Sequence, residues 1–216
     1  MIPGARLIIL GRQGAGKGTQ CVRMSRHYVV PHISTGDVLR AAVREGTELG
    51  QSAREIMDAG GLVSDEIMIG IVTERLSRPD AADGFVLDGF PRTVGQAEAL
   101  DAWLSGPSPL VVVDIEVPEE TLVRRLGFRR ICSKCGTTAS PAEILCGKCG
   151  GALVQRRDDN LEVVRERLRV YARNTQPLVE FYQRRPSFRS VDGDQTQDHV
   201  AADIAAAVAS VIGGRG

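Results

Sequence analysis

Glycines, one lysine and one threonine follow an apolar segment near the amino terminus in an order suited to binding phosphate. The apolar run 7–10 predicts a strand, and the segment 11–19 (Gly-Arg-Gln-Gly-Ala-Gly-Lys-Gly-Thr) leads into a helix-compatible stretch. Glycines allow a tight turn whose N–H groups face phosphate oxygens, and the helix N-terminus adds partial positive charge. Lys17 supplies a full charge and Thr19 a hydroxyl, although Gly18 stands where Ser or Thr is usual. We predict a nucleotide-binding P-loop; the alternative is a glycine-rich turn without a ligand.

A carboxylate and an arginine form the second candidate group. Asp88 ends an apolar segment and is followed by Gly-Phe-Pro-Arg, which ends at Arg92. Ligands of open α/β sheets bind at the carboxyl ends of strands, where an acid can hold the water shell of Mg²⁺. An arginine can bind phosphate with two parallel hydrogen bonds. The alternative is that Asp88 caps a helix and Arg92 is a solvated surface charge.

Four of the five cysteines form two CxxC pairs separated by ten residues: Cys132, Cys135, Cys146 and Cys149. Glycines follow both pairs, and this spacing is typical of a closed Cys₄ zinc site with a structural role. A segment this short has little apolar core, so bound metal would stabilise it directly. The alternative is four free thiols. Cys21 stands apart, and we expect it to be a small buried residue.

Composition excludes several classes of protein. The 216 residues suit one α/β domain with insertions, and 27 basic residues balance 27 acidic ones. Nothing in this balance calls for a nucleic-acid or membrane partner, and no apolar run approaches a membrane span. The first residues do not have the form of a signal peptide. We therefore expect a cytoplasmic protein, and a monomer because no long exposed apolar face is evident.

Apolar patterning predicts the elements that position these residues. Strands are expected at 6–10, 85–88, 110–116 and 188–191. Helices are expected at 17–27, 36–45, 48–59, 65–76, 94–104, 118–126, 161–174, 177–184 and 196–212. Strands that alternate with helices predict an α/β fold with a mostly parallel sheet. Two segments interrupt the alternation, one at 34–63 and one at about 128–158.

The chain resembles the adenylate kinase family of nucleoside monophosphate kinases. The P-loop with Gly-Thr after its lysine is that family's own form, and Asp88 to Arg92 resembles its DGFPR motif, with Gln96 at the expected spacing. Further matching segments are 32–40 (His-Ile-Ser-Thr-Gly-Asp-Val-Leu-Arg), 155–159 with Arg165 and Arg167, and 191–193. Together these segments span nearly the whole chain.

The resemblance implies a P-loop NTPase-type parallel sheet flanked by helices, with a helical NMP-binding flap and a small zinc-binding lid. The core would comprise 1–33, 64–127 and 160–216, the flap 34–63 and the lid 128–159. The implied activity is reversible phosphoryl transfer from MgATP to AMP, giving two ADP, with Mg²⁺ bound to ATP and Zn²⁺ in the lid. Nucleotides would be the only partners.

The resemblance also assigns residues to roles. It implies that ATP is bound by Gly14, Ala15, Gly16, Lys17, Gly18, Thr19, Arg125, Arg129, Thr138 and Gln195. It implies that AMP is bound by Thr35, Arg40, Gly61, Leu62, Val63, Gly89, Phe90, Pro91, Arg92, Gln96, Arg156 and Arg167. The catalytic set would be Lys17, Asp88, Arg92, Arg129, Arg156 and Arg167. Thr35 and Gln96 would favour adenine.

Two departures from the family's pattern bear on the donor side. Gln13 stands where the family usually has Pro, and the lid is shorter than the usual long form, with Ala139-Ser140 near the place of a Tyr-His pair. The alternatives are therefore a kinase with another acceptor, such as CMP, UMP or GMP, or with GTP as donor. A different class is a zinc-ribbon nucleotide switch that binds RNA or protein.

Overall fold

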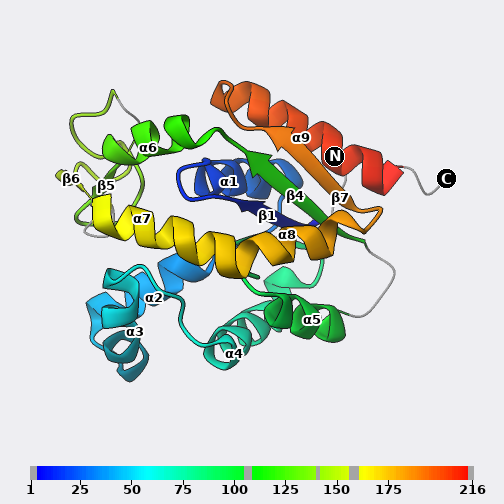
Figure 1. Ribbon diagram of the computed structural model, residues 1–216, viewed down its shortest axis with the longest axis horizontal. Coiled ribbons are helices and arrows are strands. Elements are labelled where there is room, and N and C mark those ends of the chain that lie inside the picture. Colours follow the sequence, from blue (N-terminus) through cyan, green and yellow to red (C-terminus); the bar gives the residue numbers. More distant parts are fainter. Residues whose placement is uncertain (1–3, 105–108, 140–141, 156–160, 214–216) are drawn as a thin grey trace.

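Five parallel strands form a single sheet whose carboxyl ends carry the candidate residues. The computed structural model describes residues 4–104, 109–139, 142–155 and 161–213. The sheet order is β2-β3-β1-β4-β7, and every neighbouring pair is parallel (Figure 1). The strands are β1 (Arg6–Gly11), β2 (His32–Ser34), β3 (Phe85–Asp88), β4 (Leu110–Glu116) and β7 (Phe188–Asp192). Because all five run the same way, the P-loop after β1 and the segment after β3 meet at one edge.

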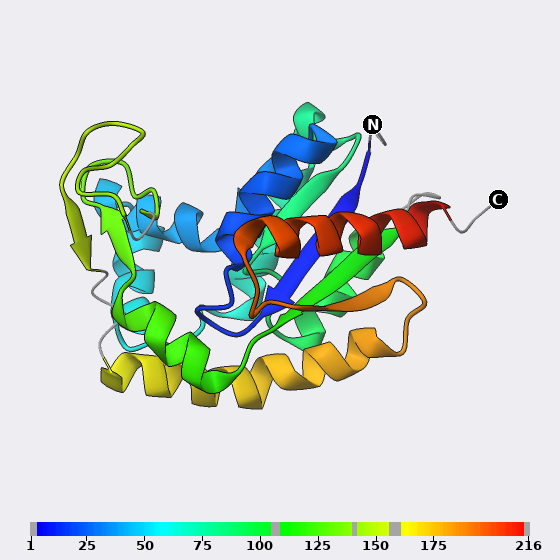
Figure 2. The ribbon, with the colours of Figure 1, turned by 90° about the horizontal axis from the view of Figure 1, so that it is seen from above.

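Helices cover both faces of this sheet. They are α1 (Lys17–Tyr28), α2 (Thr35–Glu45), α3 (Glu48–Asp58), α4 (Asp65–Leu76), α5 (Val94–Trp103), α6 (Glu119–Gly127), α7 (Leu161–Val170), α8 (Gln176–Gln183) and α9 (Gln197–Ile212), with a short 3-10 helix, η1 (Pro79–Ala81). α1 and α9 pack on one face, and α4, α5 and α8 pack on the other (Figures 1 and 2). The predicted fold class, a parallel sheet flanked by helices, is confirmed.

The apolar run of β4 shows why this layered arrangement forms. Val111 and Val113 face the core beneath α1 and α9, whereas Val112 faces the core beneath α4, α5 and α8. All three side chains are essentially inaccessible to water. Successive side chains of a strand point to opposite faces, so an unbroken apolar run requires cover on both.

The structure contains strands that the sequence analysis did not predict. β2 has only three residues, which is too short for a periodic pattern to reveal. β5 (Arg130–Cys132) and β6 (Leu153–Gln155) pair antiparallel as a separate small ribbon around the cysteines. These strands are equally short, and the spacing of the cysteines rather than apolar alternation marks this segment.

The helix expected at 161–174 also differs from the structure. α7 ends at Val170, and a π-helical turn, η3 (Tyr171–Thr175), joins it to α8 in one continuous helical path. Within this turn the Thr175 hydroxyl donates a hydrogen bond to the Arg92 carbonyl oxygen at 3.1 Å. Single π turns occur frequently at functional sites, and this one ties the helix to the segment that follows β3.

Candidate active site

One cleft of about 840 Å³ gathers residues from the sheet edge, from α2 and α3, and from the cysteine ribbon. Most of the residues that the sequence analysis selected line it: Gly14, Gly16, Lys17, Gly18, Thr19, Thr35, Arg40, Gly61, Leu62, Val63, Asp88, Gly89, Pro91, Arg92, Gln96, Arg125, Arg129, Thr138 and Arg167. The tertiary structure thus brings together residues that lie up to 153 positions apart in the sequence, the difference between Gly14 and Arg167.

Four consecutive P-loop residues, 16–19, line this cleft together with Gly14. Gly14 has φ of +88°, and a Cβ there would lie 3.1 Å from the Leu122 carbonyl oxygen, so only glycine fits the turn without strain. Gly16 precedes α1 in a left-handed conformation, and no side chain among the described residues caps this helix. By contrast, Ser34, Thr47, Thr93 and Thr196 cap α2, α3, α5 and α9. The first turn of α1 is therefore available to an anion.

Lys17 is held in position by the loop that it follows. Its ammonium donates hydrogen bonds to the carbonyl oxygens of Gly11 at 2.6 Å and Arg12 at 2.9 Å. Desolvation lowers the pKa of Lys17 to about 8, in spite of the opposing effect of the nearby Asp88 carboxylate. A phosphate group would replace lost hydration and favour the charged ammonium.

Asp88 lies beside Lys17 at the end of β3. One carboxylate oxygen is 3.4 Å from His32 Nε2, and its side chain is 16% exposed. Desolvation raises the pKa of Asp88, but the contact with His32 and the charge of Lys17 outweigh it, so the net pKa lies below the usual value. Thr93, not Asp88, caps the next helix, so the capping alternative does not hold. The ionised oxygens face the cleft and suit the water shell of Mg²⁺.

The cleft floor beyond Asp88 carries phosphate-binding groups. Arg92 Nε donates to the Gly89 carbonyl oxygen at 2.9 Å, and the Thr35 hydroxyl donates to the same oxygen at 3.0 Å. Desolvation, and then the charge of Arg167, lower the pKa of Arg92 from its usual value. Arg40 forms an ion pair with Asp37 on the first turns of α2. The positive charge of Arg167 beside Arg92 favours an anion bound between these two guanidinium groups.

An amide and apolar side chains form the far end of the cleft. Gln96 is buried, and its Oε1 accepts a hydrogen bond from the Arg92 backbone N–H at 2.8 Å. The apolar lining here includes Leu39, Met57, Val63 and Met68. A flat base needs apolar contact on its faces and a few polar groups at its edge, and this end of the cleft offers both.

Arg125 is part of the cleft lining, whereas the remaining residues selected for nucleotide binding that the structure describes do not line the cleft. Arg125 donates to the Gly193 carbonyl oxygen at 3.0 Å, beside the turn after β7. Ala15 and Phe90 are buried and do not line the cleft. Gln195 also lies outside the lining, since its amide bonds to the Asp192 carbonyl oxygen and the Asp203 carboxylate. Arg156 and the hinge residues at 158–159 fall outside the described residues.

The structure also adds residues that the sequence analysis had not selected. The charged and polar ones include Arg23, Arg26, His32, Asp37, Arg44, Lys148, Tyr171 and Thr175. Arg23 lies four residues along α1 from Thr19, and Arg26 lies four residues from Val22, so helical spacing could have indicated both. Arg44 and Lys148 carried no such signal, because nothing local indicates that α2 and the ribbon approach each other.

The four ribbon cysteines converge on one point. Their sulfur atoms lie within 4.8 Å of one another, with Cys132 to Cys149 at 3.4 Å and Cys135 to Cys146 at 3.6 Å. Backbone N–H groups of Lys134 and Cys135 point at Cys132 Sγ at 3.4 Å. The Thr137 hydroxyl and backbone N–H lower the pKa of Cys135 to about 6. Four thiols with N–H support fit a tetrahedral Zn²⁺ with no open position.

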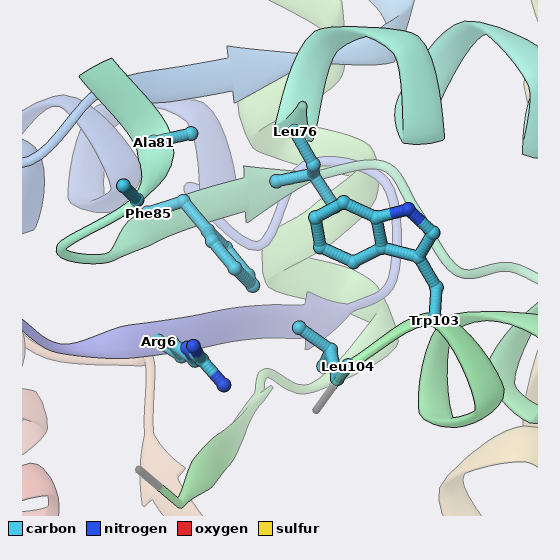
Figure 3. A pocket seen from close by; sticks show the side chains of 7 residues that line it. Arg6, Leu76, Ala81, Phe85, Trp103 and Leu104 are labelled. Carbon is cyan, nitrogen blue, oxygen red and sulfur yellow. The ribbon is translucent and has the colours of Figure 1, made fainter. Parts of the chain in front are cut away.

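A second, smaller cavity lies at the opposite end of the sheet. It measures about 170 Å³ and is lined by Arg6 and Phe85, the first residues of β1 and β3, together with Leu76, Ala81, Ala82, Trp103 and Leu104 (Figure 3). Its lining is apolar except for one guanidinium. It offers neither an acid–base pair nor a set of metal ligands, so the large cleft is the candidate active site.

Comparisons with known proteins identify the family of this chain. No helix within the described residues is both long and apolar enough to cross a bilayer. The family model described as adenylate kinase matches residues 9–187. An adenylate kinase of Desulfitobacterium hafniense (strain DSM 10664 / DCB-2) is 51% identical, covering 92% of this chain and 95% of its own. That of Archaeoglobus fulgidus is 51% identical, covering 93% and 96%. That of Clostridioides difficile (strain 630) is 48% identical, covering 95% and 99%. A match of this extent shows that the chain belongs to the adenylate kinase family.

Proposed function

We propose that this cleft transfers the terminal phosphoryl group of MgATP to AMP, reversibly, to give two ADP. The observation that carries the proposal is the meeting of Lys17, Arg92, Arg129 and Arg167 in one cleft that has a base-sized apolar end beside Gln96. The relatives named adenylate kinase support the same reaction. The donor phosphates would lie on the P-loop and the acceptor phosphate beside Arg92.

The residues divide into two binding sides in this proposal. The donor side comprises Gly14, Ala15, Gly16, Lys17, Gly18, Thr19, Arg125, Arg129, Thr138 and Gln195. The acceptor side comprises Thr35, Arg40, Gly61, Leu62, Val63, Gly89, Phe90, Pro91, Arg92, Gln96, Arg156 and Arg167. Ala15 and Phe90 would shape the backbone rather than touch nucleotide, since both are buried. Gln195 would act through its backbone, because its side chain is hydrogen bonded within its own turn and to α9.

Chemistry in this cleft would consist of positioning and charge stabilisation. The AMP phosphate is itself the nucleophile, so no side chain needs to attack. Lys17 and the arginines would hold the two nucleotides in line and stabilise charge on the transferring group. Mg²⁺ bound to ATP supplies further charge neutralisation, and Asp88 would hold its water shell. Arginines suit this task because they remain charged and match phosphate geometry.

We propose that two segments move relative to the core. The core would comprise 1–33, 64–127 and 160–216, the AMP flap 34–63, and the lid 128–159, with hinges near Gly127 and at 158–159. Closure would exclude water from the transferring phosphoryl group and limit its loss to hydrolysis. Zn²⁺ held by Cys132, Cys135, Cys146 and Cys149 would stabilise the lid and take no part in the chemistry. We further propose that the protein acts as a cytoplasmic monomer.

A transfer assay with separate acceptors tests the proposal. Purified, zinc-replete protein would be given MgATP with AMP, CMP, UMP or GMP, and GTP would replace ATP in parallel. We expect rapid ADP formation with AMP alone. Preference for another nucleotide would reassign the substrate, and tight nucleotide binding without transfer would favour a zinc-ribbon switch.

A pair of variants on one helix sharpens this test. Arg167→Ala removes a guanidinium that lines the cleft, and we expect kcat to fall by about 10²- to 10³-fold, as when one charge-stabilising donor is lost. Arg169 lies two residues beyond Arg167 and forms an exposed ion pair with Glu166. Arg169→Ala removes the same kind of group as Arg167→Ala, and we expect kcat to stay within twofold. Equal losses in both variants would contradict the proposed role of Arg167.

A further inference from the structure

A closed ring of hydrogen bonds surrounds the amide of Gln96. Its Oε1 accepts from the Arg92 backbone N–H at 2.8 Å, and its Nε2 donates to Asp65 Oδ1 at 2.7 Å. The Thr93 hydroxyl donates to Asp65 Oδ2 at 2.7 Å and accepts from the Gln96 backbone N–H at 3.1 Å. Both oxygens of Asp65 are therefore engaged by the segment that begins α5.

The partners of this amide determine its orientation. A backbone N–H can only donate, so the group that faces Arg92 must be the amide oxygen. A carboxylate can only accept, so the group that faces Asp65 must be the amide nitrogen. Exchanging the two ends would place N–H against N–H on one side and oxygen against carboxylate on the other. Gln96 is almost fully buried, so water cannot compensate for either mismatch.

Within the part of the chain that the structure describes, two hydrogen-bonding positions of the amide have no partner and remain for a ligand. An amide group has two N–H hydrogens and two oxygen lone pairs, and the ring uses one of each. The free N–H and the free lone pair match the N1 acceptor and the 6-amino donor of adenine. A 6-oxo purine presents the opposite order, with an acceptor at position 6 and N1–H as a donor, and would fit only an exchanged amide.

We propose that Asp65 is a positioning residue that makes the acceptor site selective for a 6-amino purine by fixing the orientation of the Gln96 amide. The inference rests on the proposed function, because Gln96 must face the acceptor base. Asp65 does not itself line the cleft. It acts from the first turn of α4 through Gln96 on α5, thirty-one residues further along the chain.

Removal of the carboxylate should weaken this selection. In Asp65→Ala the Gln96 Nε2 loses its acceptor, and only the Arg92 N–H still holds the amide. Loss of one hydrogen bond to a charged group corresponds to about a tenfold change in an equilibrium constant. We therefore expect KM for AMP to rise about tenfold and KM for ATP to stay within twofold. Asp65→Asn retains one carbonyl oxygen and should give an intermediate value.

Inosine monophosphate is the discriminating acceptor, since it differs from AMP only by a 6-oxo group and N1–H. We expect the ratio of kcat/KM for AMP to that for inosine monophosphate to fall about tenfold in Asp65→Ala. Dissociation constants for both nucleotides, measured by calorimetry, should change in the same ratio. A purely structural role would not shift this ratio.

Glu66 provides a matched control. It is an exposed acid in the same first turn of α4, so Glu66→Ala removes the same charge from the same helix end. We expect Glu66→Ala to leave both KM values and the selectivity ratio unchanged. Thermal unfolding of all variants would report any general loss of stability.

The outcomes separate this inference from the proposed function. An unchanged selectivity ratio in Asp65→Ala, or equal rises of KM for AMP and ATP, would overturn the positioning role while the kinase function stands. Absence of transfer to AMP by the wild-type protein would overturn the proposed function. In that case the calorimetric ratio would still decide whether Asp65 controls base selection.

Discussion

At the scale of single residues, we expect nucleotide binding to depend most directly on the charge of Lys17. Its ammonium sits on two carbonyl oxygens at the base of the P-loop, where desolvation lowers its pKa to about 8. Below pH 8 the free protein holds Lys17 mostly as the ammonium, and above pH 8 mostly as the neutral amine. Only the charged form attracts phosphate strongly.

The affinity for MgATP should therefore fall with rising pH. A group with a pKa of about 8 is about 90% charged at pH 7 and about 10% charged at pH 9, so we expect the dissociation constant to rise about tenfold between these values. Lys17→Arg keeps a charged side chain across this range and should show a flat profile, whatever its absolute affinity. Calorimetric titrations at several pH values would measure both. Equal pH dependence in the two proteins would show that another group is responsible.

At the scale of elements, the ribbon of β5 and β6 has little core of its own. Its strands have three residues each, and Ile144, Leu145 and Val154 are exposed. Cys132 and Cys146 supply its buried side chains. A segment with so little apolar burial cannot offset the entropy of ordering its backbone, so the proposed metal would contribute folding free energy.

Removal of zinc should unfold this ribbon and spare the sheet. With a strong chelator we expect backbone amides in 129–139 and 142–155 to lose protection from hydrogen exchange, whereas those of β1 and β4 keep theirs. Cys135→Ser should reduce bound zinc below one per chain. Cys21→Ala changes the buried fifth cysteine on α1 and should keep one zinc per chain. Full protection of the ribbon in the chelated protein would contradict a structural role for the metal.

At the scale of the whole molecule, charge is distributed unevenly although the formal net charge is zero. Ten cationic side chains among the described residues line the cleft: Lys17, Arg23, Arg26, Arg40, Arg44, Arg92, Arg125, Arg129, Lys148 and Arg167. Two carboxylates, Asp37 and Asp88, oppose them there. The ribbon also closely approaches α2, since a Cβ at Gly136 would lie 3.7 Å from an Arg44 nitrogen. Bringing the ribbon and α2 together without an anion between the cationic side chains of the cleft costs electrostatic free energy.

Nucleotides should therefore compact the protein. With saturating MgADP we expect a radius of gyration of about 17 Å, the value for a compact chain of this length, and a larger value without nucleotide. Small-angle X-ray scattering would measure the difference. Raising the ionic strength should reduce the radius of gyration of the nucleotide-free protein, because salt screens the repulsion between the cationic side chains that line the cleft. Equal radii with and without nucleotide at low salt would contradict charge-driven opening.

The sequence by itself determined the features that depend on local spacing. The P-loop, the Asp88 to Arg92 segment and the paired CxxC motifs each lie within one short stretch of the chain, so residue types at local spacing specify them. The parallel sheet followed from apolar runs such as 110–113, whose burial on both faces requires helices on both sides. The family also followed from these motifs, since their order spans the chain.

Only the tertiary structure decided which distant groups meet. The bond from Gln96 to Asp65 joins two helices, and the approach of Arg44 to the ribbon joins two segments that lie on separate insertions. The hydrogen bond from Thr175 in the π turn to Arg92 likewise joins residues that lie 83 positions apart. Such contacts are determined by how helices pack on the sheet, and the periodicity of one segment carries no information about its neighbour's side chains.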